Sequence, residues 1–150
     1  MIRRARAEDA PAIHALIHRY AGQDLLLPRP LTDIYDRIRD FWVATDRQGM
    51  VVGCVAMRIW WHDLAEVRSL AVDPKTRRRG VGRALVEHCI EEARSLQIPK
   101  VFALTYQAEF FRRIGFERVD KAELPHKIWR DCLKCSKFPH CDETAVLKTL

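Results

Sequence analysis

The sequence lacks any apolar run as long as a membrane span, which needs about 20 consecutive apolar residues. The basic start, Met1 to Arg6, is not followed by the apolar stretch that a secretory signal peptide requires. We therefore expect no membrane partner and a cytoplasmic location.

Internal repeats, low-complexity tracts and linkers are absent as well. Of the 150 residues, 48% are apolar and 31% are charged, as in ordinary globular proteins, which excludes disorder along the whole chain. A chain of this length can bury roughly two thirds of its unfolded surface. We predict a single domain over residues 1–150, with a cysteine-rich segment, 124–141, inside it.

The five cysteines are an odd number in a chain without an export signal, which argues against a disulfide framework. Cys54 and Cys89 stand in apolar stretches, where buried free thiols are common. The other three, Cys132, Cys135 and Cys141, are close enough in sequence to bind zinc. They lack the second two-residue interval of many zinc sites, so we predict no metal. Zinc and a redox-sensitive thiol cluster stay open as alternatives.

The net charge of +6 is unevenly distributed along the chain. A long basic face would indicate nucleic acid, because Lys and Arg release counterions from phosphates. Here four arginines crowd around two glycines in the segment 77–83. This crowding favours a small phosphate-bearing ligand, and we predict no nucleic-acid partner.

Hydrophobic periodicity and turn residues predict a mixed α/β order of elements. The sequence starts with a strand over Ile2–Ala5 and a helix from about Glu8 to Ala21, followed by a stiff apolar loop, Leu25–Pro30. The other predicted elements are a helix over Asp33–Arg39 capped by Thr32, antiparallel strands over Phe41–Ala44, Val51–Ile59 and Ala65–Val72 with turns at Asp46–Gly49 and Trp61–Asp63, a helix over Val81–Leu96, a strand over Lys100–Thr105, a helix over Ala108–Ile114, and a cysteine-rich tail that closes with Thr144–Leu147.

The segment 77–83 reads Arg-Arg-Arg-Gly-Val-Gly-Arg and stands between a predicted strand and a predicted helix. The first turn of a helix offers unpaired backbone N–H groups and a partial positive charge, and both suit a pyrophosphate. Gly80 and Gly82 lack the β-carbons that would hold such a ligand away. For so short a pattern an ordinary turn is the alternative, and each arginine can equally lie in solvent.

Two common nucleotide-binding motifs do not fit this loop. There is no third glycine at the dinucleotide spacing and no Gly-Lys-Ser/Thr, and the strands before the loop are predicted to be antiparallel. The loop therefore belongs to neither the Rossmann class nor the P-loop class.

Ser69–Pro74 followed by Arg77-x-x-Gly80-x-Gly82 resembles the acetyl-CoA motif of the GNAT superfamily. Phe110–Phe116 is similar to the second motif of that family, written FYxxxGF, and the two motifs stand in the family's order. The resemblance implies an acetyl-CoA-dependent N-acetyltransferase. It also implies the GNAT fold, an α/β (α+β) arrangement in which a mixed central sheet with antiparallel N-terminal strands is flanked by helices.

For the cofactor, the resemblance implies that the strand before the glycine loop holds the pantetheine of acetyl-CoA and that the loop holds its pyrophosphate. The third and fourth long strands would separate to admit the thioester. The implied cofactor-binding residues are Leu70, Ala71, Val72, Arg77, Arg78, Arg79, Gly80, Val81, Gly82, Arg83 and Phe110.

Acetyl transfer requires a neutral amine, and a carboxylate that removes a proton helps to supply it. In many GNAT enzymes a glutamate at a place comparable to Glu66 is this general base; the alternative is a solvated residue paired with Arg68 or Arg58. The family often places a tyrosine near the second motif as general acid, but the positions here read Phe110 and Phe111. Tyr106 is the nearest substitute, and a packed aromatic is its alternative role.

A narrower resemblance concerns the acceptor. The segments Leu26–Pro30, Glu66–Val72, Val101–Thr105 and Leu124–Cys132 are similar to short-form bacterial N-acetylglutamate synthases. This resemblance implies acetylation of L-glutamate, the entry step of arginine biosynthesis. The implied acceptor-binding residues are Arg29, Arg68, Thr105, Lys127, Arg130 and Lys134.

A dicarboxylate requires two separated cationic anchors, and Arg can hold a carboxylate through two parallel bonds. Each of these cations taken singly can equally lie in solvent. Another small amine or a protein amine remains an alternative acceptor, and a non-catalytic module that senses CoA or binds nucleic acid remains an alternative function. A homodimer is left open.

Overall fold

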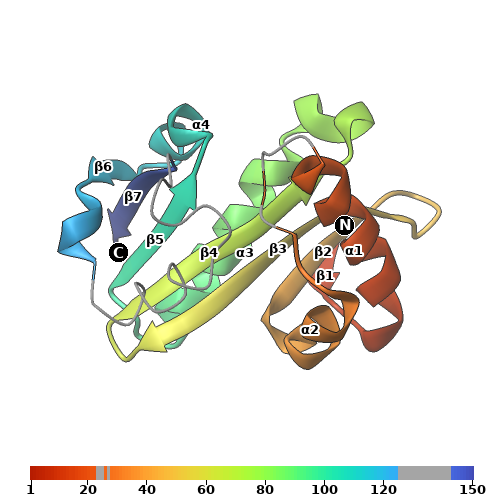
Figure 1. The fold of residues 1–150 in the computed structure, drawn as a ribbon, viewed down its shortest axis with the longest axis horizontal. Helices are drawn as coiled ribbons and strands as arrows, with labels where there is room; N and C mark the ends of the chain where they lie inside the picture. The colour runs from red at the N-terminus through yellow and green to blue at the C-terminus, as the bar shows by residue number, and fades with distance from the viewer. Residues whose placement is uncertain (23–25, 27, 125–142) are drawn as a thin grey trace. The chain divides into compact units, whose positions relative to one another are not determined.

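The computed structural model describes residues 1–22, 26, 28–124 and 143–150, and for Arg77–Arg79 it describes the backbone. In this part of the chain, seven strands form one mixed sheet in the order β1-β2-β3-β4-β5-β7-β6 (Figure 1). The strands are β1 (Ile2–Arg4), β2 (Phe41–Thr45), β3 (Val51–Trp61), β4 (Leu64–Val72), β5 (Lys100–Thr105), β6 (Glu117–Val119) and β7 (Thr144–Thr149).

The helices stand between the strands in sequence. They are α1 (Ala10–Ala21), α2 (Leu31–Asp36), α3 (Val81–Ser95) and α4 (Ala108–Arg113), with 3-10 turns at Ala7–Asp9, Ile38–Asp40, Pro74–Arg79 and Lys121–Glu123. β2 pairs antiparallel with β1 and with β3, β4 pairs parallel with β5, and β7 pairs antiparallel with β5 and β6. The predicted mixed sheet with antiparallel N-terminal strands is confirmed.

Packing divides the chain into two compact units, Met1–Arg58 with Val67–Glu92, and Ile59–Glu66 with Ala93–Leu150. The prediction of a single domain over residues 1–150 stays a prediction. No helix in the described ranges is both long enough and apolar enough to cross a membrane.

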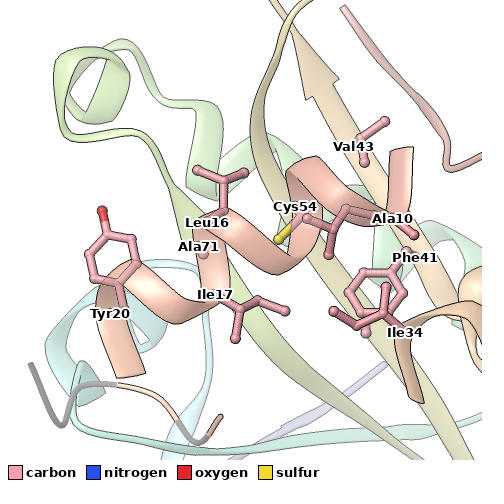
Figure 2. Close-up of a cluster of buried hydrophobic side chains, with 11 residues drawn as sticks. Ala10, Leu16, Ile17, Tyr20, Ile34, Phe41, Val43, Cys54 and Ala71 are labelled. Carbon is pink, nitrogen blue, oxygen red and sulfur yellow. The ribbon is translucent and has the colours of Figure 1, made fainter. Parts of the chain in front are cut away.

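The core of the first unit lies between α1 and the first strands of the sheet (Figure 2). The apolar residues of α1 recur at helical spacing, so Ile13, Ile17 and Tyr20 are all buried on one face. They belong to the same cluster as Phe41 of β2 and Cys54 of β3. Cys54 and Cys89 are buried free thiols, as predicted, and burial raises the pKa of Cys54 to about 12.

Helix α3 packs against β3 at a glycine. A β-carbon on Gly53 would lie 3.1 Å from Cδ1 of Leu85 and 3.2 Å from Cγ1 of Val81, both on α3. The absence of a side chain therefore lets the start of α3 approach the sheet closely. A hydrogen bond of 3.2 Å from Trp42 Nε1 to Glu92 Oε1 joins the far end of this helix to β2.

The second unit is built on the antiparallel pairing of β5 with β7, from Lys100 opposite Thr149 to Thr105 opposite Thr144. Its apolar cluster includes Phe102 and Ala145. After α4 the chain turns at Gly115, whose φ of 102° favours glycine. Lys148 Nζ of β7 donates a 3.2 Å hydrogen bond to the carbonyl oxygen of Ile114, at the end of α4.

Three predicted boundaries were wrong. The helix expected over Asp33–Arg39 with Thr32 as its cap is α2, which starts after Pro30, because Pro30 is extended and its carbonyl accepts from Ile34 N. Arg37 then leaves helical geometry, and Ile38 begins a separate 3-10 turn. The turn expected over Trp61–Asp63 is shorter, since β3 continues to Trp61 and β4 starts at Leu64.

Strand β6 was not predicted, and the tail segment Thr144–Leu147 was not identified as the strand β7. β6 has three residues, and two of them are charged, so its sequence gives no alternating apolar pattern. One partner of β7 is β5, about forty positions away in sequence, and no local signal indicates such a pairing.

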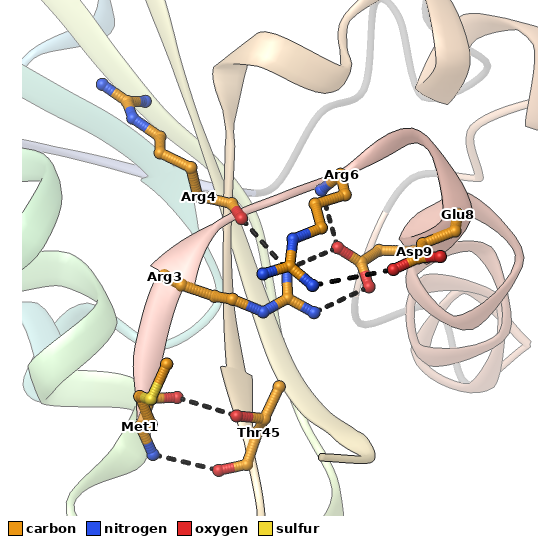
Figure 3. Close-up of polar contacts among 7 residues, drawn as sticks. All are labelled: Met1, Arg3, Arg4, Arg6, Glu8, Asp9 and Thr45. Atoms are coloured by element: carbon orange, nitrogen blue, oxygen red, sulfur yellow. Dashed lines mark hydrogen bonds and ion pairs between the residues drawn. The ribbon is translucent and has the colours of Figure 1, made fainter.

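A buried carboxylate ties β1 to the start of α1 (Figure 3). Asp9 is 6% exposed, and both of its oxygens accept from the Arg3 guanidinium, at 2.7 and 3.0 Å. The backbone N–H of Arg6 donates to it as well, at 2.6 Å. The hydrogen bond from Arg3 is the main cause that lowers the pKa of Asp9 below its usual value of 3.8, and burial opposes it.

We predict that Asp9→Asn lowers the free energy of unfolding at pH 7 by about 1.5–3 kcal/mol, the size of a hydrogen bond to a charged group. Because the folded pKa is depressed, this stabilisation is present above the unfolded pKa and is lost as the pH falls through the folded pKa. Urea unfolding at pH 7, 5 and 3 should show that the difference in free energy of unfolding between the variant and the native chain shrinks as the pH falls. Glu8→Gln, at an exposed neighbour, is the control; a difference for Asp9→Asn that is independent of pH would contradict this.

Candidate active site

The glycine loop follows β4 without a break. Asp73 caps the 3-10 turn Pro74–Arg79, and its side chain accepts a 3.0 Å hydrogen bond from Lys75 N. Gly80 then adopts a left-handed conformation, with φ 74° and ψ 16°, and α3 starts at Val81. The turn therefore ends where the unpaired N–H groups and the positive dipole end of a 15-residue helix begin.

Space is available for a side chain at Gly80 among the described residues. A β-carbon on Gly80 would meet nothing within 4 Å, so glycine is required here by the backbone conformation and not by a crowded neighbour. An open approach to a helix N-terminus is the arrangement that a pyrophosphate needs. The backbone geometry here fits the phosphate end of acetyl-CoA, and the predicted contacts of the individual loop residues stay a prediction.

The cationic part of the prediction is only partly described. Arg83 is exposed on α3, where its Nε donates a 2.8 Å hydrogen bond to Glu87. Such a surface pair is weak and can be exchanged for a phosphate contact. The side chains of Arg77, Arg78 and Arg79 lie outside the described part of the structure.

The last residues of β4 are fixed from the first unit's core. Ala71 is buried in that core, Leu70 is half-buried, and the hydroxyl of Tyr20 on α1 donates to the carbonyl oxygen of Val72. The sequence did not indicate Tyr20, because its spacing on α1 only suggests a core residue.

Ser69 interrupts the extended geometry of β4. Its φ is 56°, in the left-handed region that non-glycine residues rarely adopt. Its carbonyl oxygen accepts from the Cys54 thiol at 3.6 Å, and its hydroxyl accepts from Arg29 Nη1 at 3.1 Å. Sequence analysis gave Ser69 no role, because serine carries no signal for this conformation. A strained residue held by two partners beside a cofactor loop is a candidate site residue.

Arg29 is a buried cation, 9% exposed, placed beside Ser69. Its Nε donates to Asp33 Oδ2 at 2.9 Å, and its Cζ lies 5.0 Å from the centroid of the Phe41 ring. His18 Nε2 on α1 contacts the backbone oxygen of Arg29 at 3.2 Å. Fixed side chain and backbone together give this guanidinium one orientation.

Burial lowers the pKa of Arg29 below its usual value. The hydrogen bond to Asp33 acts in the opposite direction, and the nearby positive charge of Arg68 lowers the pKa further. A guanidinium has five N–H donors, and Asp33 and Ser69 are the hydrogen-bond acceptors of Arg29 among the described residues. The site thus combines a desolvated cation, remaining donors and a second cation, which suits an anionic ligand.

In the second unit, Glu66 of β4 is 7% exposed, and Trp60 Nε1 donates a 3.0 Å hydrogen bond to its Oε1. Because Glu66 is buried, the alternative of a solvated strand residue does not hold. The parallel pairing of β4 with β5 consists of Ala65 opposite Val101 and Glu66 opposite Phe102. The separation of these strands beyond Glu66 stays a prediction.

Three other predicted residues lie on or after β5. Thr105 is 8% exposed, and its hydroxyl accepts a 2.7 Å hydrogen bond from Gln107 N, which fixes the turn into α4. Phe110 packs edge to face on Phe111, with ring centroids 5.2 Å apart. Tyr106, which directly follows Thr105, is half-buried. Their roles stay predictions.

The predicted acceptor cations of the tail, Lys127, Arg130 and Lys134, lie outside the described residues. The same holds for Cys132, Cys135 and Cys141. Within residues 1–22, 26, 28–124 and 143–150, no three His, Cys, Asp or Glu side chains are grouped so that they could hold a metal ion.

The model of the acetyltransferase (GNAT) domain family matches residues 37–118, more than half of the chain and including the glycine loop. This chain belongs to the GNAT acetyltransferase family. It is an acetyl-CoA-dependent N-acetyltransferase, and its seven-stranded mixed sheet with flanking helices is the GNAT fold. The sequence resemblance to this family is confirmed.

Two relatives match most or nearly all of this chain. An uncharacterized N-acetyltransferase of Chlorobaculum tepidum is 44% identical over 99% of this chain and 96% of its own length. The amino-acid acetyltransferase of Mycobacterium tuberculosis is 44% identical over 80% of this chain and 70% of its own length.

Two solved structures of CoA complexes share the fold. A Mycobacterium tuberculosis protein in complex with CoA superposes with a TM-score of 0.87 at 34% identity, covering 100% of this chain and 99% of that one. N-acetylglutamate synthase from Neisseria gonorrhoeae, complexed with CoA and N-acetyl-glutamate, superposes with a TM-score of 0.91 at 30% identity. The match covers 100% of this chain and 35% of that one. This chain thus spans about a third of the Neisseria enzyme.

We predict that Gly80→Ala weakens CoA binding about tenfold, because a left-handed alanine costs about 1–2 kcal/mol and the loop relaxes away from the phosphate-binding geometry. Gly49→Ala is a matched control: Gly49 also has a positive φ, 81°, and open space around it, but it lies in the turn between β2 and β3. Both variants should lose similar stability, and calorimetric titration with CoA should separate them. Equal CoA affinities would contradict the loop assignment.

Proposed function

We propose that this GNAT enzyme acetylates the α-amino group of an amino acid, and that the amino acid is L-glutamate, as in the first step of arginine biosynthesis. The observation that carries the proposal is the buried guanidinium of Arg29, which has donors to spare and Arg68 close by. A polyamine or a lysine side chain would bring a further positive charge to this place. An amino acid brings a carboxylate.

The energetics favour a bound anion at Arg29. A buried charge is costly unless it is paired and hydrogen-bonded. Asp33 supplies one carboxylate, but its side chain is 44% exposed, so water screens part of its charge. A substrate carboxylate that takes the remaining donors in a two-bond geometry completes the shell of the guanidinium.

Named relatives support the same acceptor class. The Mycobacterium tuberculosis relative is an amino-acid acetyltransferase, and the Neisseria gonorrhoeae synthase was solved with N-acetyl-glutamate. The acceptor assignment for this chain is our extension of those properties to its own Arg29.

The reaction requires residues of β4 and the loop to bind acetyl-CoA and to position the acceptor. Acetyl-CoA supplies the activated acetyl group as a thioester. The N–H groups at the start of α3 and the loop arginines bind its pyrophosphate, and the backbone of Leu70 and Val72 aligns its pantetheine arm. Arg29 and Ser69 hold the acceptor's carboxylate, which brings the adjacent amine to β4.

The amine must lose a proton before it attacks, and Glu66 is the carboxylate on β4 that we assign as general base. Its burial and its hydrogen bond from Trp60 hold the carboxylate in place on β4, and a carboxylate in such a position can accept a proton directly or through water. Tyr106 is the group assigned to protonate the departing CoA thiolate. Since a thiol is a moderately good acid, this second task requires less help.

Thiol release from acetyl-CoA against a panel of twenty amino acids, spermidine and a lysine peptide tests the acceptor. We predict turnover with L-glutamate well above that with any neutral or basic amine. Arg29→Gln should raise the KM for L-glutamate about tenfold or more, as expected for the loss of a charge-assisted hydrogen bond, with little change in the KM for acetyl-CoA.

Arg29→Lys is the matched variant, since it keeps the charge and loses the planar fork of the guanidinium. Its KM for L-glutamate should lie between those of the native protein and Arg29→Gln. Equal increases of both KM values in Arg29→Gln would mean that the residue supports folding alone. A larger signal with spermidine or the peptide than with any amino acid would overturn the proposed acceptor.

We predict that Glu66→Gln lowers kcat about 100-fold or more at pH 7, which is the usual contribution of a general base, while CoA affinity is unchanged. Glu117→Gln, at an exposed glutamate of β6, is the control and should retain full activity. The pH dependence of kcat/KM provides the decisive readout, because the acidic limb of the native profile should disappear in Glu66→Gln. The same limb in both proteins would remove Glu66 as the base.

A further inference from the structure

Arg58 lies on the face of β3 that meets the first unit's core. β2 and β3 pair with Phe41 opposite Ala56, and strand residues alternate between the two faces. Cys54 and Ala56 are both in the core cluster, so Arg58, two residues further on, points to the same side just past the end of the core. It is half-buried there, two residues beyond Ala56, the last residue of β3 that pairs with β2 in the described part of the chain.

Asp40 connects Arg58 with the acceptor cations. Burial is the largest influence on this carboxyl and raises its pKa, while the positive charges of Arg37, Arg29, Arg58 and Arg68 all act to lower it. The charges of Arg68 and Asp40 in turn act on the pKa of Arg29: Arg68 lowers it and Asp40 raises it. Two carboxylates, Asp33 and Asp40, therefore stand among arginines from β3, β4 and the segments on both sides of α2, and the arginines outnumber them.

We infer that Arg58 is a specificity-determining residue, which binds the side-chain carboxylate of the acceptor while Arg29 binds its α-carboxylate. This inference rests on the proposed function. The amine and the α-carboxylate share one carbon atom, so the carboxylate next to Ser69 of β4 must be the α-carboxylate if the amine is to reach the cofactor strand. The side chain of the amino acid then extends toward β3, where Arg58 supplies the second anchor.

The consequence is selection by charge. Glutamate and glutamine have nearly the same size, and they differ in the negative charge that a guanidinium can pair with through two parallel hydrogen bonds. A site with a cation at this point favours glutamate, because the half-buried guanidinium would face a neutral amide if glutamine were bound.

The test compares Arg58→Gln with the native chain on L-glutamate and on L-glutamine. We expect kcat/KM for L-glutamate to fall about tenfold or more, as for a lost charge-assisted bond, while the smaller value for L-glutamine and the KM for acetyl-CoA stay unchanged. Arg58→Lys should recover part of the preference. Arg47→Gln, in the exposed turn between β2 and β3, removes the same charge away from the site and should change nothing.

Unchanged discrimination in Arg58→Gln, or equal losses on both amino acids, would overturn the role of Arg58 while leaving glutamate acetylation intact. Native protein that turns over no acidic amino acid would overturn the proposed function and this inference together. If L-aspartate proves the better substrate, the same comparison with L-asparagine decides the role of Arg58. Thermal unfolding of each variant shows whether a loss of activity reflects folding.

Discussion

A guanidinium held inside the first unit is the constraint on which the acceptor side of this enzyme depends. Arg29 is 9% exposed, and Phe41, Asp33 and Ser69 fix it from three elements of the chain. Burying a charge in this way is unfavourable unless partners compensate for the lost water. Asp33 compensates only in part, and Arg68 acts against it. In the proposed function, the acceptor's carboxylate supplies the remaining compensation, which would link the packing of the core to substrate recognition.

Strand β4 connects this cation with the cofactor loop. Ser69 contacts Arg29, and three residues later Val72 is fixed by Tyr20, after which Asp73 and Gly80 direct the chain into α3. The left-handed conformation of Ser69 breaks the regular strand between these two points. We propose that this short stretch of backbone, which core contacts hold in place, aligns both the acceptor's carboxylate and the CoA phosphates.

The cofactor loop could be predicted from sequence because its determinants are local: two glycines, a proline turn and an amphipathic helix. Arg29 was identified by family resemblance, since nothing in its own neighbourhood shows that it is buried. The left-handed Ser69 carries no residue signature, and the approach of Arg58 to Asp40 depends on the register of β2 and β3, which pairs residues distant in sequence. Helix α2 was misplaced because Pro30 allows a start that periodicity alone does not reveal.

The most direct test of the acceptor site is a crystal structure of the enzyme with CoA and N-acetyl-L-glutamate bound. We predict that the α-carboxylate of the ligand lies within hydrogen-bond distance of the Arg29 guanidinium and the Ser69 hydroxyl, with the acetamide directed along β4 toward the loop that ends at Gly80. A ligand bound with both carboxylates away from Arg29, or with its acetyl group directed away from β4, would contradict the assignment of this buried arginine as the anchor of the acceptor.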